Sequence, residues 1–191
     1  MACAILRNGE TRAPEVNVAA RGGSGDLASL KREIAQQRPF SSREEEALLN
    51  LLRTADFFER AVQHRTREWG ITSTQYNVLR ILRGAGPEGL TCNAIGERMI
   101  AAEPDITRLL SRLKALKLIR QRRDPHDRRV VRTQIAEAGL ELLRKMDAMV
   151  LAAPKELLGH LSAAEVEEMI RLLEKARHGA QALTCEGKKA G

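Results

Sequence analysis

Arginine and lysine side chains are concentrated between residues 108 and 132, where ten of them stand against only two aspartates, Asp124 and Asp127. Cations at this density neutralise phosphates, and arginine also reads guanine through a bidentate pair of hydrogen bonds. The whole chain carries a net charge of +7 with a pI near 9.8. This balance favours an acidic partner, either nucleic acid or an anionic membrane surface, and net charge alone does not choose between them.

Two helical patterns and a hairpin pattern position these charges. Thr91 is a predicted N-cap for a helix over 92–99, and a turn over 100–102 leads to a second helix that starts near Glu103, with Pro104 in its first turn. Strand patterns over 118–123 and 129–135 flank a turn with proline in its second position. The order is therefore helix, turn, helix, hairpin.

Longer helical patterns flank this region. Residues 1–24 show no periodicity and are expected to form a disordered or loosely ordered extension, and residues 25–40 contain a short helix. A capping box at 41–45 begins a long helix that reaches about residue 70, and a further helix restarts at Thr72 or Ser73. From about Ala136 a long helix runs until Pro154 interrupts or ends it, and a second capping box, Ser162 with Glu165, begins the last helix. The sequence predicts a mainly α fold with a small β-hairpin wing.

A helix-turn-helix places its second helix in the major groove, with the N-terminal residues of that helix at the base edges. Glu103 and Asp105 would repel phosphate, so capping or acceptance of a hydrogen bond from cytosine N4 is the expected role of both. Arginines at a hairpin tip can enter a narrow minor groove. The predicted DNA-contacting residues are Thr91 and Asn93 for phosphate, Pro104, Asp105, Thr107, Arg108 and Arg112 for bases, and Arg128 and Arg129 for the minor groove.

Other classes of function find little support. No apolar run is long enough for a membrane span, and no signal peptide is evident, so a cytoplasmic location is expected. The three cysteines (Cys3, Cys92 and Cys185) are far apart and indicate neither a disulfide framework nor a zinc site. The four histidines show no metal-ligand spacing, and no nucleotide-binding or hydrolase motif is present. We therefore expect no catalytic activity, no metal and no cofactor.

The runs ITSTQYNVLRIL, LTCNAIGERMI, PDITRLLSRL and LIRQRRDPHDRRVV resemble the winged helix-turn-helix of MarR-family transcription regulators, and D-x-x-D-R-R in the wing is the most specific part. The resemblance covers roughly residues 48 to 177. It implies a homodimer held by interlocked helices over 41–70 and 137–184, completed by the extra helix over 25–40, with a DNA-binding lobe over 71–136. It also implies a pseudo-palindromic operator, a repressor more often than an activator, and wing support from Asp124 and Asp127. Ala136 stands where relatives carry a capping threonine, so a weak helix start is expected there.

The resemblance further implies a small aromatic or phenolic effector that binds between the dimer helices and the DNA-binding lobe. Candidate residues for such a cleft are Phe58, His64, Arg65, Trp69, Tyr76 and Arg80. Two alternatives stay open. One is a thiol-based redox sensor, for which Cys92 at a helix N-terminus is the candidate. The other is a non-specific architectural DNA-binding protein, which would bind all sequences with nearly equal affinity.

Overall fold

The computed structural model describes residues 29–125 and 127–187, and the chain divides after Asn50 into two compact units. The predicted extension over 1–24 and the beginning of the predicted helix over 25–40 lie outside the described residues.

The first unit contains α1 (Leu30–Glu33) and the beginning of α2 (Arg43–Arg67). The helix predicted within 25–40 is shorter than expected at its C-terminal end, because α1 stops at Glu33 and Ala35 takes a positive φ of 52°. The capping box that begins α2 is confirmed. Ser42 Oγ accepts a hydrogen bond from the Glu45 amide at 3.1 Å, and the Glu45 carboxylate accepts one from the Ser41 amide at 2.6 Å. The hydroxyl and the amide of Ser41 both donate to the Glu45 carboxylate and lower its pKa, the hydroxyl contributing most.

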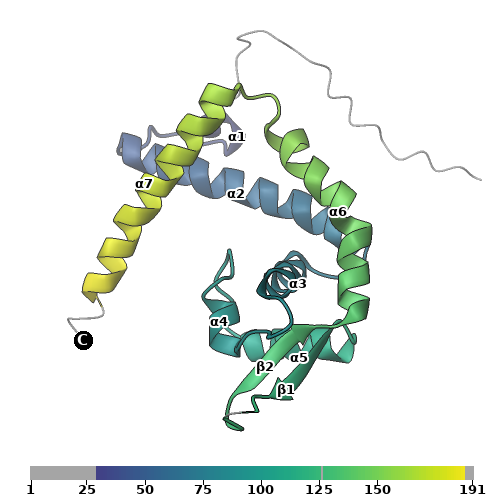
Figure 1. The fold of residues 1–191 in the computed structure, drawn as a ribbon. Helices are drawn as coiled ribbons and strands as arrows, with labels where there is room; N and C mark the ends of the chain where they lie inside the picture. The colour runs from purple at the N-terminus through teal and green to yellow at the C-terminus, as the bar shows by residue number, and fades with distance from the viewer. Residues whose placement is uncertain (1–28, 126, 188–191) are drawn as a thin grey trace, which may run out of the picture. The chain divides into compact units, whose positions relative to one another are not determined.

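The second unit contains the rest of α2 and the elements of a winged helix (Figure 1). Figure 1 shows short helices gathered against the β-hairpin, with a long helix starting beside the hairpin. The mainly α fold with a β-hairpin wing is thus confirmed. In chain order the elements are α3 (Ser73–Ala85), α4 (Cys92–Gly96), α5 (Ile106–Ala115), β1 (Ile119–Arg123), β2 (Val131–Ile135), α6 (Glu137–Leu158) and α7 (Ala163–Gly187).

Local sequence signals explain where these helices begin. Gly70 has φ +74° after α2, as expected for a residue just past a helix end. Thr72 and Gln75 form a reciprocal capping box at the start of α3. Ser162 and Glu165 form another at α7, with the Ser162 amide donating to the Glu165 carboxylate at 2.8 Å. Ala136 is the N-cap residue of α6 and offers it no side-chain hydrogen bond, as expected from the sequence.

Three predicted boundaries were wrong. The helix predicted over 92–99 stops at Gly96, and the next begins at Ile106 instead of near Glu103. The reason is that Asp105 acts as N-cap, so Pro104 lies before the helix and not in its first turn. Pro154 neither ends nor divides α6, which continues to Leu158. Proline removes one N–H from the helix, and the exposed position of Pro154 keeps its ring out of the packed interior.

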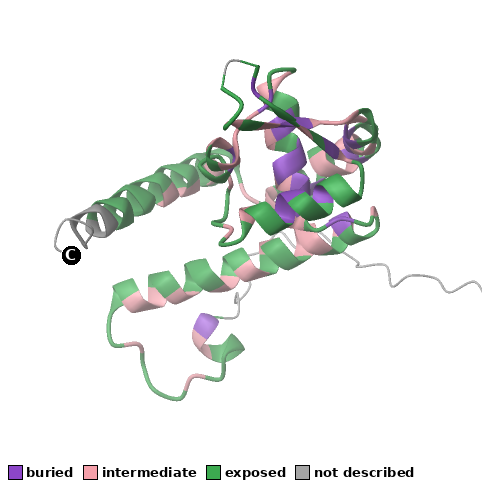
Figure 2. Cartoon of the chain, turned by 90° about the horizontal axis from the view of Figure 1, so that it is seen from below, coloured by how far each residue is buried: buried purple, intermediate pink, exposed green. Residues whose placement is uncertain are grey.

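The hydrophobic core lies in the winged helix and the first half of α6. Its members come from α3, α4, α5, β1 and α6, so the helix-turn-helix and the wing share one interior; Figure 2 shows the buried residues gathered there. The fully buried members are Val78, Leu79, Leu82, Ile95, Leu113, Leu143 and Met146.

A backbone bridge joins the start of α4 to the wing. The Leu90 amide donates to the Thr133 carbonyl at 2.9 Å, and the Thr133 amide donates to the Leu90 carbonyl at 2.7 Å. Gly89, with φ +67°, permits this approach, because a Cβ atom there would lie 2.4 Å from the Thr133 carbonyl oxygen. The bridge fixes α4 and β2 relative to one another.

Helices α2 and α7 bury little within one chain. Thr66 is the buried residue of α2, and no residue of α7 over 163–182 is buried. Large apolar side chains instead face solvent along α2, α6 and α7, including Leu51, Leu52, Phe57, Leu151, Ile170 and Leu172. Across 29–125 and 127–187, no helix has both the length and the apolarity to cross a bilayer.

Candidate nucleic-acid interface

Helix α5 is divided into a buried face and an exposed face. Leu109, Leu110 and Leu113 are buried, whereas Thr107, Arg108 and Arg112 are exposed. The Asp105 carboxylate accepts a hydrogen bond from the Arg108 amide at 2.9 Å, which fixes the start of the helix and confirms the capping role expected of this residue. The predicted base-reading residues of α5 therefore project from one anchored surface.

A buried aspartate organises the wing. Asp124 is 8% exposed, and its carboxylate pairs with Arg132 on β2 and accepts a hydrogen bond from the Asp127 amide. Asp127 is exposed and accepts a hydrogen bond from the Arg129 amide at 2.9 Å. The two predicted support residues thus act at different depths, Asp124 inside the hairpin and Asp127 at its tip. Arg132 was not among the predicted site residues, because its partner lies eight positions away and spacing alone does not indicate the pair.

Three arginines of this region differ in their pairing from four arginines of the long helices. Arg43, Arg60, Arg144 and Arg171 each pair with a carboxylate on the same helix. In contrast, the side chains of Arg108, Arg112 and Arg128 have no carboxylate partner among the described residues. Arg129 is 96% exposed and only 4.0 Å from Asp127. Positive charge is therefore available for an external anion on α5 and at the wing tip.

The predicted phosphate-binding residues lie at the start of α4. Thr91 Oγ1 accepts a hydrogen bond from the Ala94 amide at 3.3 Å, as an N-cap does, and its hydroxyl proton stays available to an anion. Asn93 is exposed. The Asn77 side chain of α3 accepts a hydrogen bond from the Ile100 amide at 3.2 Å and so holds the turn between α4 and α5.

Among the predicted effector-cleft residues, only Tyr76 and Arg80 are in described contact. The Arg80 guanidinium lies 5.9 Å from the centre of the Tyr76 ring. The Tyr76 hydroxyl is buried with no hydrogen-bond partner in the described part of the chain. Burial raises its pKa, and the charges of Arg80 and Arg83 oppose that rise. Trp69 packs on the core, Phe58 is half-buried and His64 is exposed.

No described cavity is lined by these cleft candidates. A cavity of about 460 Å³ belongs to the first unit and is lined by Ser29, Lys31, Pro39, Phe40, Ser42, Arg43 and Glu46.

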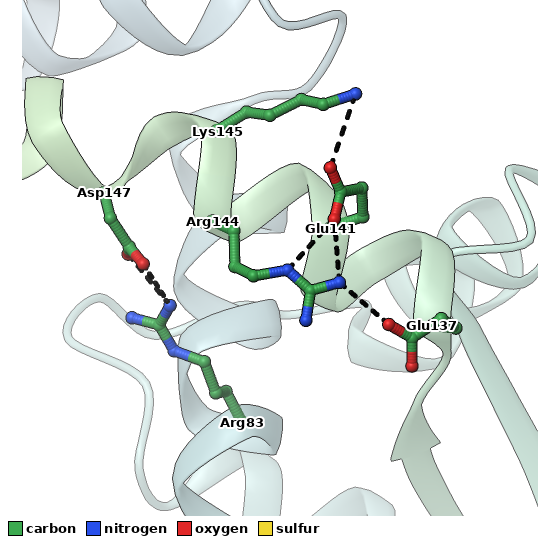
Figure 3. A network of polar contacts seen from close by, with 6 residues as sticks. All are labelled: Arg83, Glu137, Glu141, Arg144, Lys145 and Asp147. Carbon is green, nitrogen blue, oxygen red and sulfur yellow. Dashed lines mark hydrogen bonds and ion pairs between the residues drawn. The ribbon is translucent and has the colours of Figure 1, made fainter.

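Ion pairs connect α6 to its neighbours (Figure 3). Arg83 of α3 reaches both carboxylate oxygens of Asp147, at 2.8 and 3.1 Å. Arg65 of α2 pairs with Glu156. Along α6 itself, Arg144 bridges Glu137 and Glu141 and lowers the pKa of Glu141. The first two pairs join α6 to two other helices of the second unit.

No group of three or more metal-ligating side chains occurs within 29–125 and 127–187. Cys92 is a free, half-buried thiol that directly follows the α4 N-cap.

Comparison with known proteins shows which family has this architecture. The family model described as "MarR family" matches residues 69–130. The crystal structure of a MarR transcription factor from Planctomyces limnophilus is 40% identical, with a TM-score of 0.55; the match covers 71% of this chain and 98% of that one. The chain belongs to the MarR family of transcription regulators.

Two further proteins extend the comparison. An HTH-type transcriptional regulator of Bacillus subtilis, YkoM, is 29% identical over 141 residues, which are 72% of this chain and 90% of YkoM. Bordetella bronchiseptica BpsR, whose DNA binding is regulated by 6-hydroxynicotinic acid, has the same fold at 24% identity, with a TM-score of 0.64. That match covers 73% of this chain and 98% of BpsR.

Proposed function

We propose that this MarR-family chain is a homodimeric repressor that binds a pseudo-palindromic operator and releases it when a small aromatic or phenolic acid binds. The observation that carries the proposal is the pairing of charges. Arg60 and Arg171 of the long helices pair with carboxylates on their own helices. Arg108 and Arg112 of α5 and Arg128 of the wing tip have no carboxylate partner among the described residues, and Arg129 reaches only the exposed Asp127, at 4.0 Å. A duplex phosphate backbone supplies the missing anions.

Roles within the interface follow from position. Arg108 and Arg112 project from α5 and are proposed to read bases in the major groove, together with Thr107. Arg128 and Arg129 at the wing tip are proposed to enter the adjacent minor groove. Pro104 and Asp105 lie at the helix start, where Asp105 already caps α5. Thr91 and Asn93 are proposed to bond phosphate.

The homodimer is supported by the apolar side chains that one chain leaves exposed. Leu51, Leu52 and Phe57 of α2 and Ile170 and Leu172 of α7 are between 42% and 57% exposed. Burying such a surface against a second copy removes apolar area from water and is favourable. We therefore assign residues 41–70 and 137–184 to dimerisation and 71–136 to DNA binding, with the extra helix within 25–40 completing the dimer.

Selection of DNA fragments tests the operator and the dimer together. Full-length protein is incubated with fragments of the DNA flanking its own gene, and bound fragments are sequenced. We expect an inverted repeat whose half-site centres are about one helical turn, 10–10.5 base pairs, apart or a multiple of that. Sedimentation should give twice the chain mass of 21.2 kDa. Enrichment of a single unrepeated site, or a monomer at micromolar concentration, would contradict the proposal.

The effector is proposed from the regulation of BpsR by 6-hydroxynicotinic acid and from the buried, unpartnered Tyr76 hydroxyl beside Arg80. An aromatic acid offers a ring for packing and a carboxylate for a guanidinium. Titration of the protein–operator complex with benzoate, 4-hydroxybenzoate and 6-hydroxynicotinate should raise the operator Kd at least tenfold for one of them. The Arg80→Gln variant should respond less.

A redox sensor is the second candidate, because Cys92 is a free thiol at the start of α4, beside the proposed phosphate-binding residues. Loss of operator binding on mild peroxide treatment, abolished by Cys92→Ser, would favour it over the aromatic effector.

A further inference from the structure

The register of the hairpin places several arginines on one face of the wing. Arg120 lies opposite Gln134, and Arg122 lies opposite Arg132. Residues two apart in a strand share a face, so all four side chains belong to the same side of the hairpin. The opposite side carries Ile119 and Thr133, which are buried against the helices. Of the four, Arg120 and Arg122 are exposed, whereas Gln134 is buried. Arg120 and Arg122 therefore lie on the outer face of the wing.

Charges on this face are only partly compensated. Like charges directly opposite each other destabilise an antiparallel pair. Arg132 is neutralised by the buried Asp124, but Arg122 has only Glu88, 3.9 Å away on a side chain that is 80% exposed. A surface pair of this kind contributes little and is screened by salt. The positive charge of Arg122 therefore contributes little to the stability of the hairpin.

Arg120 is held in a fixed orientation by a buried amide. Its Nε donates to Gln134 Oε1 at 3.0 Å, and the Gln134 amide nitrogen donates to the Pro87 carbonyl. Gln134 is 3% exposed, so the amide is anchored inside the protein while Arg120 itself is exposed. The two terminal nitrogens of Arg120 have no carboxylate partner in the described part of the chain. An oriented guanidinium with free terminal nitrogens suits a phosphate group.

We propose that Arg120 and Arg122 form a second phosphate-binding surface on the outer face of the wing, separate from the tip arginines. Its ligand is the backbone of the same DNA duplex that α5 and the tip engage, so the inference rests on the proposed function. The two side chains are two strand positions apart, about 7 Å, a distance comparable with that between neighbouring phosphates on one DNA strand. The surface adds affinity without reading sequence.

The competing explanation is that these charges protect an exposed strand edge. Strand β1 pairs only with β2 among the described residues, and arginine or lysine on an edge strand discourages pairing between molecules. That explanation predicts aggregation, and no change in DNA binding, when the charges are removed.

The test is the salt dependence of duplex binding by the full-length protein. Fluorescence anisotropy with one labelled 40-base-pair duplex of fixed random sequence is measured at several salt concentrations for wild type, Arg122→Gln and Arg120→Gln/Arg122→Gln. Each lost phosphate contact lowers the slope of log affinity against log salt by about 0.9, so a dimer of the single variant loses about 1.8 and one of the double variant about 3.6. Arg122→Lys should keep the wild-type slope, because it keeps the charge.

The matched control is Arg144→Gln/Lys145→Gln. It removes the same number of positive charges, two, from the exposed face of α6. The control should leave the slope within about 0.5 of wild type. A slope for Arg120→Gln/Arg122→Gln equal to that of the control, with or without aggregation, overturns this inference alone. A wild-type protein without salt-dependent duplex binding would overturn the proposed function as well.

Discussion

Removing the ion pair between Asp124 and Arg132 inside the wing should change the affinity for DNA. The direction of that change separates two explanations of DNA binding. Replacing Asp124 by asparagine keeps the shape of the side chain and its acceptance of the Asp127 amide hydrogen bond. It removes the charge that faces Arg132 and leaves Arg132 directly opposite Arg122. The perturbation is therefore electrostatic and local to the hairpin.

The magnitude follows from burial. The Asp124 side chain is 11% exposed and that of Arg132 is 34% exposed. Exposed ion pairs contribute about 0–1 kcal/mol, whereas breaking a fully buried pair costs about 3–5 kcal/mol. We expect Asp124→Asn to lower the free energy of unfolding by about 2 kcal/mol, or Tm by about 4–8 °C for a chain of this size. Urea and thermal unfolding at one fixed protein concentration measure both quantities.

DNA binding by Asp124→Asn separates two effects, the position of the wing and the net charge of the protein. Asp124→Asn makes the protein more positive, so long-range attraction alone would strengthen binding. If the Asp124–Arg132 pair holds the wing in its binding position, affinity should instead fall at least fivefold. Glu97→Gln is the charge-matched control, because Glu97 is exposed and has no described ion-pair partner. An Asp124→Asn protein that unfolds within about 0.5 kcal/mol of wild type and binds DNA as tightly as Glu97→Gln would refute this reasoning.

Four further substitutions have expected outcomes. Arg108→Ala should relax sequence preference and Arg129→Ala should weaken binding to most sequences; equal relative losses on operator and random DNA for both variants would refute this division. Ala136→Thr should supply the missing cap of α6 and raise the free energy of unfolding by about 1 kcal/mol, measured by urea denaturation. Gly139→Ala should cost about 1–3 kcal/mol in the same assay, because its Cβ would lie 2.4 Å from the backbone carbonyl just before β1, whereas Gly84→Ala, with open space around it, should not destabilise the protein.

Local signals in the sequence were enough to predict the elements. Capping pairs such as Ser162 with Glu165 lie three residues apart in the sequence and were confirmed as helix starts. The hairpin was predicted within two residues at each end, because strand patterns flank a turn sequence. The start of α5 was misplaced because Pro104 and Asp105 each suit a helix N-terminus, and only the backbone shows that Asp105 is the cap.

Polar contacts between residues that are distant in the sequence could not be predicted from it. Asp124 is buried because Arg132 neutralises it across the hairpin, and the sequence does not say which of the wing aspartates has that role. Gln134 is buried because the Pro87 carbonyl and Arg120 satisfy its amide group, 47 and 14 positions away. A polar residue inside a strand pattern does not reveal such partners. These long-range polar contacts orient the side chains of Arg120 and Arg132 on the wing.

The central claim is that the exposed cations of α5 and the wing read a specific sequence and do not merely attract DNA. Its most direct test is the ratio of Kd values, at one salt concentration near 0.15 M, for random duplex and for the inverted repeat selected from the DNA flanking the gene. A specific regulator binds its site about 10³-fold or more tightly than random DNA. We expect a ratio of that order, and a ratio near one would contradict the claim and favour an architectural DNA-binding protein.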